Sequence, residues 1–184
     1  GLTWNDRNLL ADGVKEGENA GGLSRAGRKM VREMRRLGML LDLSHIAPMG
    51  FYQAIDEYQG PVLVTHANVR NLCDHPRNLD DNQLKTLAKN GGVIGLNQVS
   101  DFVKASPKPN LDDFIDHIVY ISELIGVKNV ALGSDFDGAD QVILPGVDGY
   151  IQLELFLEQR GFTRQEIEMI FSKNVERVIK QILK

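Results

Sequence analysis

Thiols are nearly absent from this chain of 184 residues, which contains a single cysteine, Cys73. One cysteine excludes an internal disulfide, and it excludes a zinc cluster built of several thiolates at fixed spacing. Any metal ion that the chain binds must therefore be held by histidine, aspartate or glutamate. The sequence offers four histidines for this purpose.

Long apolar runs and an excess of positive charge are also missing. No segment approaches the ~20 consecutive apolar residues of a membrane-spanning helix, and the residues after Gly1 lack the basic and apolar pattern of a signal peptide. The formal net charge is −4, with Lys and Arg dispersed among Asp and Glu, which argues against nucleic-acid binding. We therefore expect a cytoplasmic protein with neither a membrane nor nucleic acid as a partner. A signal peptide upstream of Gly1 is left open.

The composition is that of one globular domain over residues 1–184, with 42% apolar and 25% charged residues. Four short runs rich in Val, Ile and Leu predict buried parallel strands. Segments with helical spacing of apolar residues and with capping residues lie between and after them. The predicted strands are 39–43, 61–64, 92–96 and 130–132, and the predicted helices are 24–37, 47–58, 80–89, 110–126, 150–159 and one that opens at Thr163.

This alternation of strands and helices predicts an α/β fold. Four strand–helix units are half of an eight-stranded barrel of the TIM, or (β/α)8, type. Half a barrel leaves backbone N–H and C=O groups unpaired along the two strands at its edges. The other half is therefore expected to be encoded before Gly1, to be supplied by another chain, or to be replaced by a second copy of this chain.

Three of the four predicted strands end in a side chain that can bind a metal or transfer a proton. His45 and His66 follow the first two strands, and Asp135 follows the fourth. Active-site groups of such barrels lie at the carboxyl ends of the strands. One histidine in such a place can simply cap a loop, but three groups at equivalent positions predict a metal site. Two imidazoles suit zinc, which activates water, and Asp135 would then act as the general base.

Arg77 lies in the loop after the strand that ends at His66, on the same face of the predicted barrel. Its guanidinium can hold a substrate carboxylate with two hydrogen bonds. The alternative is an arginine in a solvated loop. His75, in the same loop, and His117, inside an amphipathic helix, are assigned to surface and structural roles.

Several short motifs occur in a fixed order along the whole chain. They are LTWN at 2–5, LADG at 10–13, GLS at 22–24, LGMLLDLSH at 37–45, PVLVTHAN at 61–68, RNL at 77–79, GGVIGLN at 91–97, GSDFDG at 133–138 and NVERV at 174–178. No single motif is specific, but the ordered set resembles the membrane (renal) dipeptidase family, peptidase family M19. The resemblance implies a TIM-type barrel of the metal-dependent hydrolase superfamily, of which residues 1–184 form the C-terminal half.

The resemblance also implies an activity, which is zinc-dependent hydrolysis of the peptide bond of a dipeptide. His45 and His66 would bind the second zinc ion of a two-zinc centre. Arg77 would hold the carboxylate of the dipeptide. Asp135 would be the acid–base group near the substrate amine.

Part of the family's site is missing from this sequence. The His-x-Asp pair of the family and the glutamate that bridges its zinc ions belong upstream of the matching motifs, and no His-x-Asp occurs in the chain. Trp4 stands where mammalian members carry a substrate-contacting histidine. We therefore expect residues 1–184 alone to be inactive and to bind zinc weakly, whereas the full-length protein is expected to be an enzyme.

Two other hypotheses stay open at this point. The protein can be another metal-dependent amidohydrolase, because the side chains that decide substrate choice are not identifiable. It can also be a non-catalytic half-barrel that self-associates through its edges. If it is a dipeptidase, the expected partners are a dipeptide, the N-terminal half of the barrel and a second copy of the chain in a homodimer.

Overall fold

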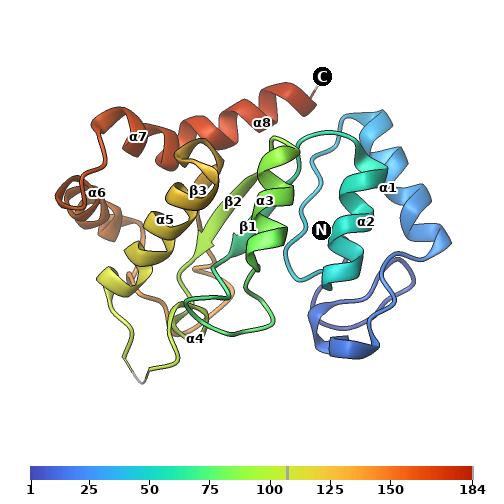
Figure 1. Ribbon diagram of the computed structural model, residues 1–184, viewed down its shortest axis with the longest axis horizontal. Helices are drawn as coiled ribbons and strands as arrows, with labels where there is room; N and C mark the ends of the chain where they lie inside the picture. Colours follow the sequence, from blue (N-terminus) through green and yellow to red (C-terminus); the bar gives the residue numbers. More distant parts are fainter. Residues whose placement is uncertain (107, 184) are drawn as a thin grey trace.

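The computed structural model describes residues 1–106 and 108–183, and its centre is a parallel sheet. Three strands pair in the order β1 (Leu63–Ala67), β2 (Val93–Asn97) and β3 (Val130–Ser134). All five residues of β2 are buried, as expected for a strand covered on both faces. The prediction of an α/β fold with a parallel sheet is confirmed, and the described residues form no closed barrel (Figure 1).

The predicted strand at 39–43 is wrong. Only a single parallel bridge, between Asp42 and Leu63, joins this segment to β1. The next backbone donor along β1, the N–H of Thr65, bonds to the Asp42 side chain at 3.0 Å and not to a backbone carbonyl. His45 then adopts a left-handed φ of 68°, which turns the chain away from the strand. A side chain therefore takes the place of the backbone ladder at this edge of the sheet.

Five helices form where the sequence predicts them, and they are α1 (Arg25–Leu37), α2 (Pro48–Tyr58), α3 (Asp81–Lys89), α5 (Leu111–Ile125) and α6 (Tyr150–Gln159). The side chains of Ser24, Asp80 and Asn110 accept hydrogen bonds from backbone N–H groups in the first turns of α1, α3 and α5. Gly38, with a φ of 70°, ends α1 in the left-handed conformation that glycine adopts without strain. The short helical turns that the sequence does not predict are η1 (Val14–Asn19), α4 (Ser100–Val103), η2 (Val127–Asn129) and η3 (Val147–Gly149).

The helix that opens at Thr163 consists of three parts. α7 (Arg164–Glu168) continues through a π-helical turn, η4 (Met169–Lys173), into α8 (Asn174–Ile182). Asn174, at the junction, is buried and donates to two carbonyl oxygens just before and at the start of β3, both at 2.8 Å. The π-helical turn lies directly before Asn174, whose hydrogen bonds join the helix to β3. The spacing of apolar residues in the helix does not predict this turn.

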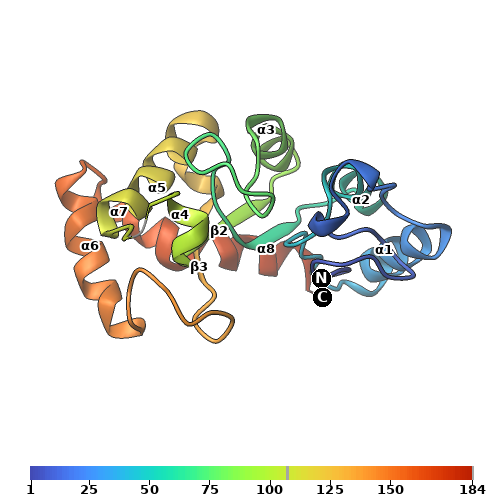
Figure 2. The ribbon, with the colours of Figure 1, turned by 90° about the horizontal axis from the view of Figure 1, so that it is seen from below.

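The long helices leave the carboxyl ends of the strands to the loops and to the short helix α4. α3 and α5 lie together on one side of the strands (Figure 2). α8 crosses the amino ends of β2 and β3, where Arg177 donates to the carbonyl oxygen of Gly91. α4 lies at the opposite end (Figure 1). Side chains that follow the strands are therefore gathered at one end of the molecule. Throughout the part of the chain described here, no helix has the length and hydropathy to span a membrane.

Three buried asparagines fix the loop between β1 and α3, which carries Arg77. The Asn68 side chain donates to the carbonyl of Asn97 at 2.8 Å and accepts from the N–H of the same residue at 3.1 Å. Asn78, next to Arg77, accepts from the N–H of Asn68 at 3.1 Å. Losing one of these partners would leave a buried polar group unsatisfied. The loop is thus held against the carboxyl end of β2.

His117 in α5 is a structural residue, and it is fully buried rather than at the surface. Its Nδ1 accepts from the N–H of Val69 at 3.1 Å, so Nε2 carries the proton and donates to the carbonyl of Val103 at 2.8 Å. A protonated ring cannot accept the first of these bonds. Burial lowers the pKa of His117 below its usual value, which keeps the ring neutral.

Acid is therefore expected to destabilise the protein through His117. The folded ring stays neutral, whereas an unfolded histidine protonates near its ordinary pKa of about 6.5. The contribution of His117 to the free energy of unfolding is therefore fully present above this pH. It decreases as the pH falls below it, by up to about 1.4 kcal/mol per pH unit. Urea unfolding over a series of pH values should show the loss in the wild-type protein and a smaller one in His117→Gln. Equal slopes for the two proteins would contradict the prediction.

Candidate metal centre

The structure brings His45 and His66 together at the carboxyl end of β1. His66 is the fourth residue of β1, and His45 follows the segment that bridges to the start of the same strand. Their Nε2 atoms are 2.8 Å apart, and the ring planes are inclined by 64°. Both imidazoles therefore point at one place, as their strand-end positions predict.

The second nitrogen of each imidazole is held by a hydrogen-bond acceptor. Nδ1 of His45 lies 2.7 Å from the side-chain oxygen of Asn5. Nδ1 of His66 lies 2.8 Å from Oγ1 of Thr65. The Thr65 hydroxyl donates its only proton to Asp42 at 2.9 Å, so it presents a lone pair to the ring. Both rings then carry their proton on Nδ1, and the two Nε2 lone pairs face each other.

Electrostatics keep a proton out of this pair. Burial, and after it the positive charge of Arg77, lowers the pKa of His45 to about 3 and also lowers the pKa of His66. Two lone pairs 2.8 Å apart repel each other unless a cation relieves them. Neutral imidazoles whose other nitrogen is hydrogen-bonded are the usual ligands of zinc and similar metals. The two residues therefore fit a metal ion.

The described residues supply only part of a metal site. Within residues 1–106 and 108–183, no group of three or more His, Cys, Asp or Glu side chains lies close enough together to hold an ion. Burial pushes the pKa of Asp42 up, but hydrogen bonds from Ser44 and Thr65 outweigh it and hold that pKa below its usual range. Asp42 is thus engaged as an acceptor of protein donors. A metal held by the two imidazoles needs further ligands.

Asp135 follows β3 in a strained turn at the same end of the sheet. Ser134 and Asp135 have positive φ values of 40° and 70°. Such conformations cost about 1–3 kcal/mol per residue and cluster at functional sites. Asn97, the last residue of β2, donates to Oδ2 of Asp135 at 3.1 Å. This arrangement places the carboxylate in the wall of a cavity that His45 also lines.

That cavity has a volume of about 180 Å³ and contains three of the four predicted site residues in its wall. They are His45, Arg77 and Asp135, and His66 adjoins them through its contact with His45. Trp4 is 65% exposed and forms part of the wall, with its ring centre 6.1 Å from that of His45. The remaining lining residues are Asn5, Val99, Phe102, Gly138 and Ala139.

Arg77 is buried, with only 5% of its surface exposed, so the interpretation as a solvated loop arginine is wrong. Its guanidinium lies 5.6 Å from the centre of the Phe102 ring and donates to the carbonyl of His66 at 3.1 Å. Burial lowers the pKa of Arg77 to about 10. No carboxylate of the described residues lies within ion-pair distance of it. A buried cation without a partner is costly, so the site favours a ligand that brings an anion.

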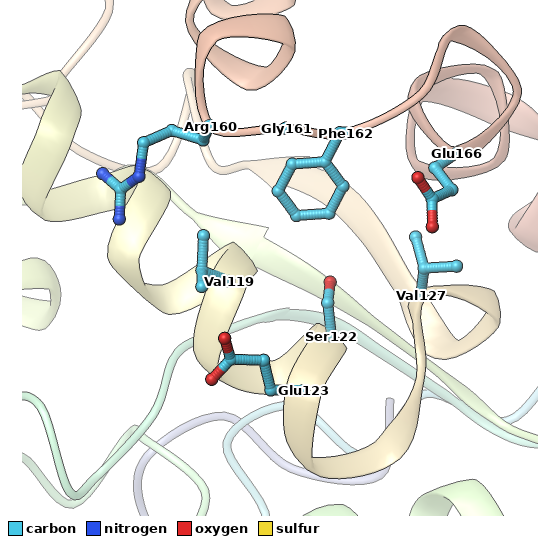
Figure 3. Close-up of a pocket in the computed structure, with 8 residues that line it drawn as sticks. All are labelled: Val119, Ser122, Glu123, Val127, Arg160, Gly161, Phe162 and Glu166. Atoms are coloured by element: carbon cyan, nitrogen blue, oxygen red, sulfur yellow. The ribbon is translucent and has the colours of Figure 1, made fainter.

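A larger cavity, of about 260 Å³, lies elsewhere on the molecule (Figure 3). It lies between α5 and the turn from α6 to α7, with Phe162 on one side and Ser122 on the other. Val127, at its edge, begins the turn that leads directly into β3, so the cavity adjoins the amino end of the sheet. Its lining includes neither histidine nor cysteine. In α/β proteins with parallel sheets, ligands bind at the carboxyl ends of the strands, and we therefore take the cavity beside His45 as the candidate site.

Four polar residues that orient the predicted ones are not among the predicted site residues, and they are Asn5, Asp42, Thr65 and Asn97. Asp42 and Thr65 lie in the same strand-end motifs as His45 and His66, and Asn97 ends β2. A polar residue at the carboxyl end of each buried strand is the signal that identifies these three. Asn5 carries no such signal, because it precedes all the paired strands.

Comparison with known proteins gives one consistent result. The profile of the family described as Membrane dipeptidase (Peptidase family M19) matches residues 1–184. An uncharacterised dipeptidase of Schizosaccharomyces pombe is 38% identical over 184 residues, which cover 97% of this chain and 45% of the relative. Dipeptidase tcpJ of Claviceps purpurea is 35% identical over 164 residues, which cover 88% of this chain and 39% of the relative.

A solved structure is similar over the same range. The metallo peptidase from Rhodobacter sphaeroides, liganded with a phosphinate mimic of the dipeptide L-Ala-D-Ala, superposes with a TM-score of 0.91 at 27% identity. The superposition covers 98% of this chain and 54% of that chain. The chain thus spans about half the length of the proteins it matches.

Proposed function

The chain belongs to the membrane dipeptidase family, peptidase family M19, a family of metallopeptidases, and we propose that the complete protein hydrolyses dipeptides at a centre of two zinc ions. The observation that carries this proposal is the convergence of two neutral imidazoles, His45 and His66, beside the buried cation of Arg77, which has no carboxylate partner among residues 1–106 and 108–183. A pair of metal ligands next to an anion-binding group suits a small substrate with a free carboxylate.

Each residue has a defined task in this proposal. His45 and His66 hold one zinc ion through Nε2, and the bound zinc supplies Lewis acidity that polarises the scissile carbonyl and activates water. Arg77 binds the carboxylate of the dipeptide with two parallel hydrogen bonds. The substrate is thereby oriented so that its peptide bond lies at the metal ligands.

Asp135 is the acid–base group. Asn97 holds its Oδ2, and the carboxylate accepts a proton from the attacking water. It then gives the proton to the nitrogen of the leaving amine as the C–N bond breaks, and the carboxylate is regenerated. The wall that Asp135 shares with His45 and Arg77 supports this role.

Gly138 is expected to be needed for the position of Asp135. A Cβ added at Gly138 would lie 2.1 Å from Oδ1 of Asp135. Gly138→Ala should therefore displace the carboxylate of Asp135 and leave the backbone in place. A displacement of about 1 Å can lower a catalytic rate ~10²-fold. Steady-state kinetics should show this loss in kcat, with the thermal midpoint little changed. Gly146→Ala is the matched control, since a Cβ there meets nothing within 4 Å; equal losses in both variants would contradict the prediction.

We infer further that residues 1–184 are the C-terminal half of a (β/α)8 barrel. β3 pairs only with β2 among the described residues, so its outer edge keeps N–H and C=O groups that a further strand can pair. The coverage of about half of each relative supports this inference. The other half brings the remaining zinc ligands, and residues 1–184 alone hydrolyse no dipeptide.

Metal removal from the complete protein tests the function. A chelator is expected to abolish dipeptide hydrolysis, and added zinc is expected to restore it, because the two imidazoles alone cannot polarise the peptide carbonyl. A panel of dipeptides, tripeptides and N-acylated amino acids distinguishes a dipeptidase from an amidohydrolase that acts on other amides. Hydrolysis at full rate after the metal has been removed would refute the proposal.

A further inference from the structure

We propose that Asp42 is a positioning residue, which acts through the hydroxyl of Thr65 to fix the tautomer of His66. In this tautomer the proton is on Nδ1, and Nε2 is left free as a ligand. The inference rests on the proposed function in one respect only, that His66 binds metal. The tautomer itself is a property of the metal-free protein and can be measured without any reaction.

Asp42 accepts four hydrogen bonds from two residues. Its Oδ1 accepts from the N–H and the hydroxyl of Ser44, at 3.0 and 2.9 Å, and from the N–H of Thr65 at 3.0 Å. Its Oδ2 accepts from the hydroxyl of Thr65 at 2.9 Å. A carboxylate can only accept, and charge makes these bonds strong. Asp42 therefore determines where the Thr65 proton points.

The direction of the next bond follows from a count of protons. The Thr65 hydroxyl has one proton, which Asp42 takes, so its contact with Nδ1 of His66 at 2.8 Å uses a lone pair of oxygen. His66 must then be the donor, with its proton on Nδ1. The hydroxyl of Ser44 accepts from the backbone N–H of His66 at 3.1 Å, so the same carboxylate also braces the main chain at the ligand.

His45 is oriented by a different residue. Its Nδ1 contacts the neutral side chain of Asn5, which comes from the N-terminal segment and shares no hydrogen bond with Asp42, while its Nε2 faces that of His66 at 2.8 Å and can accept from it. A change at Asp42 should therefore alter the proton position on His66 and leave that on His45 unchanged. This difference separates a directed effect on one ring from general loosening of the site.

Asp42→Asn is expected to reverse the chain of hydrogen bonds. The asparagine oxygen can keep the backbone bonds of Ser44 and Thr65, while the amide NH₂ takes the place of Oδ2 and donates to the Thr65 hydroxyl. The Thr65 proton then turns toward Nδ1 of His66, which at 2.8 Å is nearer to Oγ1 of Thr65 than the hydroxyl of Ser44 at 3.1 Å, and the ring proton moves to Nε2. The size of the side chain is unchanged, but the variant also loses a negative charge that acts on both imidazoles and on Arg77, so the proton position on His66, and not the zinc affinity alone, decides the test.

The test uses the intact protein with nitrogen-labelled histidine, freed of metal, and two readouts. NMR of the imidazole nitrogens gives the tautomer, with the His66 signal identified by its loss in His66→Gln. Titration with zinc gives the affinity. We expect a proton on Nδ1 in the wild-type protein and on Nε2 in Asp42→Asn, with zinc bound about 10–100-fold more weakly by the variant. Activity is not needed for either readout.

Variants of Thr65 test the relay if Asp42→Asn folds poorly. Thr65→Val keeps the shape of the side chain without the hydroxyl, so the His66 proton should no longer be fixed on Nδ1. Thr65→Ser keeps the hydroxyl, so the proton should stay on Nδ1. A His66 that keeps its proton on Nδ1 in both Asp42→Asn and Thr65→Val overturns the proposal, whether or not zinc binds. A wild-type protein that shows the expected tautomers and binds no zinc would instead support the relay and overturn the proposed function.

Discussion

Replacing His66 by alanine is expected to lower kcat/KM for dipeptide hydrolysis by about 10³-fold, because a metal ion contributes several kcal/mol to transition-state stabilisation and about 1.4 kcal/mol corresponds to a factor of ten. The content of bound zinc per protein molecule, measured after gel filtration, should fall in parallel. Stability should change little, since the His66 side chain is only partly buried. Kinetics, metal analysis and thermal unfolding of the complete protein check the three parts of this prediction.

The double variant gives a sharper criterion than either single one. His45 and His66 point at one place, with their Nε2 atoms 2.8 Å apart, so their losses should not add. His45→Ala should cost about as much as His66→Ala, and the double variant should cost little more than the worse of the two, because groups that act as a unit are non-additive. Losses that multiply in the double variant would show that the two rings serve separate tasks.

The fold class could be predicted because local rules and packing agree in this sequence. The apolar runs at 61–64, 92–96 and 130–132 all became paired strands, and the caps Ser24 and Asp80 began helices where expected. The run at 39–43 is also mainly apolar but forms only a single bridge, since its pairing ends where the Asp42 side chain replaces a backbone acceptor. Apolar periodicity carries no information about such a side-chain competitor.

Some features of the candidate site can likewise be predicted from the sequence, and others cannot. His45, His66 and Asp135 are visible in the sequence because the carboxyl ends of parallel strands meet at one edge, whatever the loops do. The burial of Arg77 is not visible, because its cover comes partly from Phe102 in α4, a helix that the pattern does not predict. The direction of hydrogen bonds around Thr65 is equally hidden, since it depends on which neighbour takes a single proton.

Arg77→Met is expected to raise KM for dipeptides by about 10²–10³-fold with a smaller effect on kcat, since truncating one partner of a buried charge pair costs about 2–5 kcal/mol. The buried guanidinium has no carboxylate partner among the described residues, and so the substrate anion is its expected partner. Arg77→Lys should fall between the wild-type protein and Arg77→Met, because an ammonium keeps the charge and loses the planar pair of donors. Steady-state kinetics of the three proteins measure both constants.

The substrate supplies the control for Arg77. A dipeptide amide has no C-terminal anion, so the wild-type protein should use it poorly, and Arg77→Met should lose little further activity toward it. The ratio of kcat/KM for the acid to that for the amide should therefore fall toward one in the variant, because the group that distinguishes the carboxylate from the amide has been removed. Equal losses toward acid and amide would assign Arg77 a different role, in which its bond to the carbonyl of His66 at 3.1 Å supports the metal ligand. The carboxylate-binding role therefore depends on the acid-to-amide ratio, because a loss of activity alone is common to both explanations.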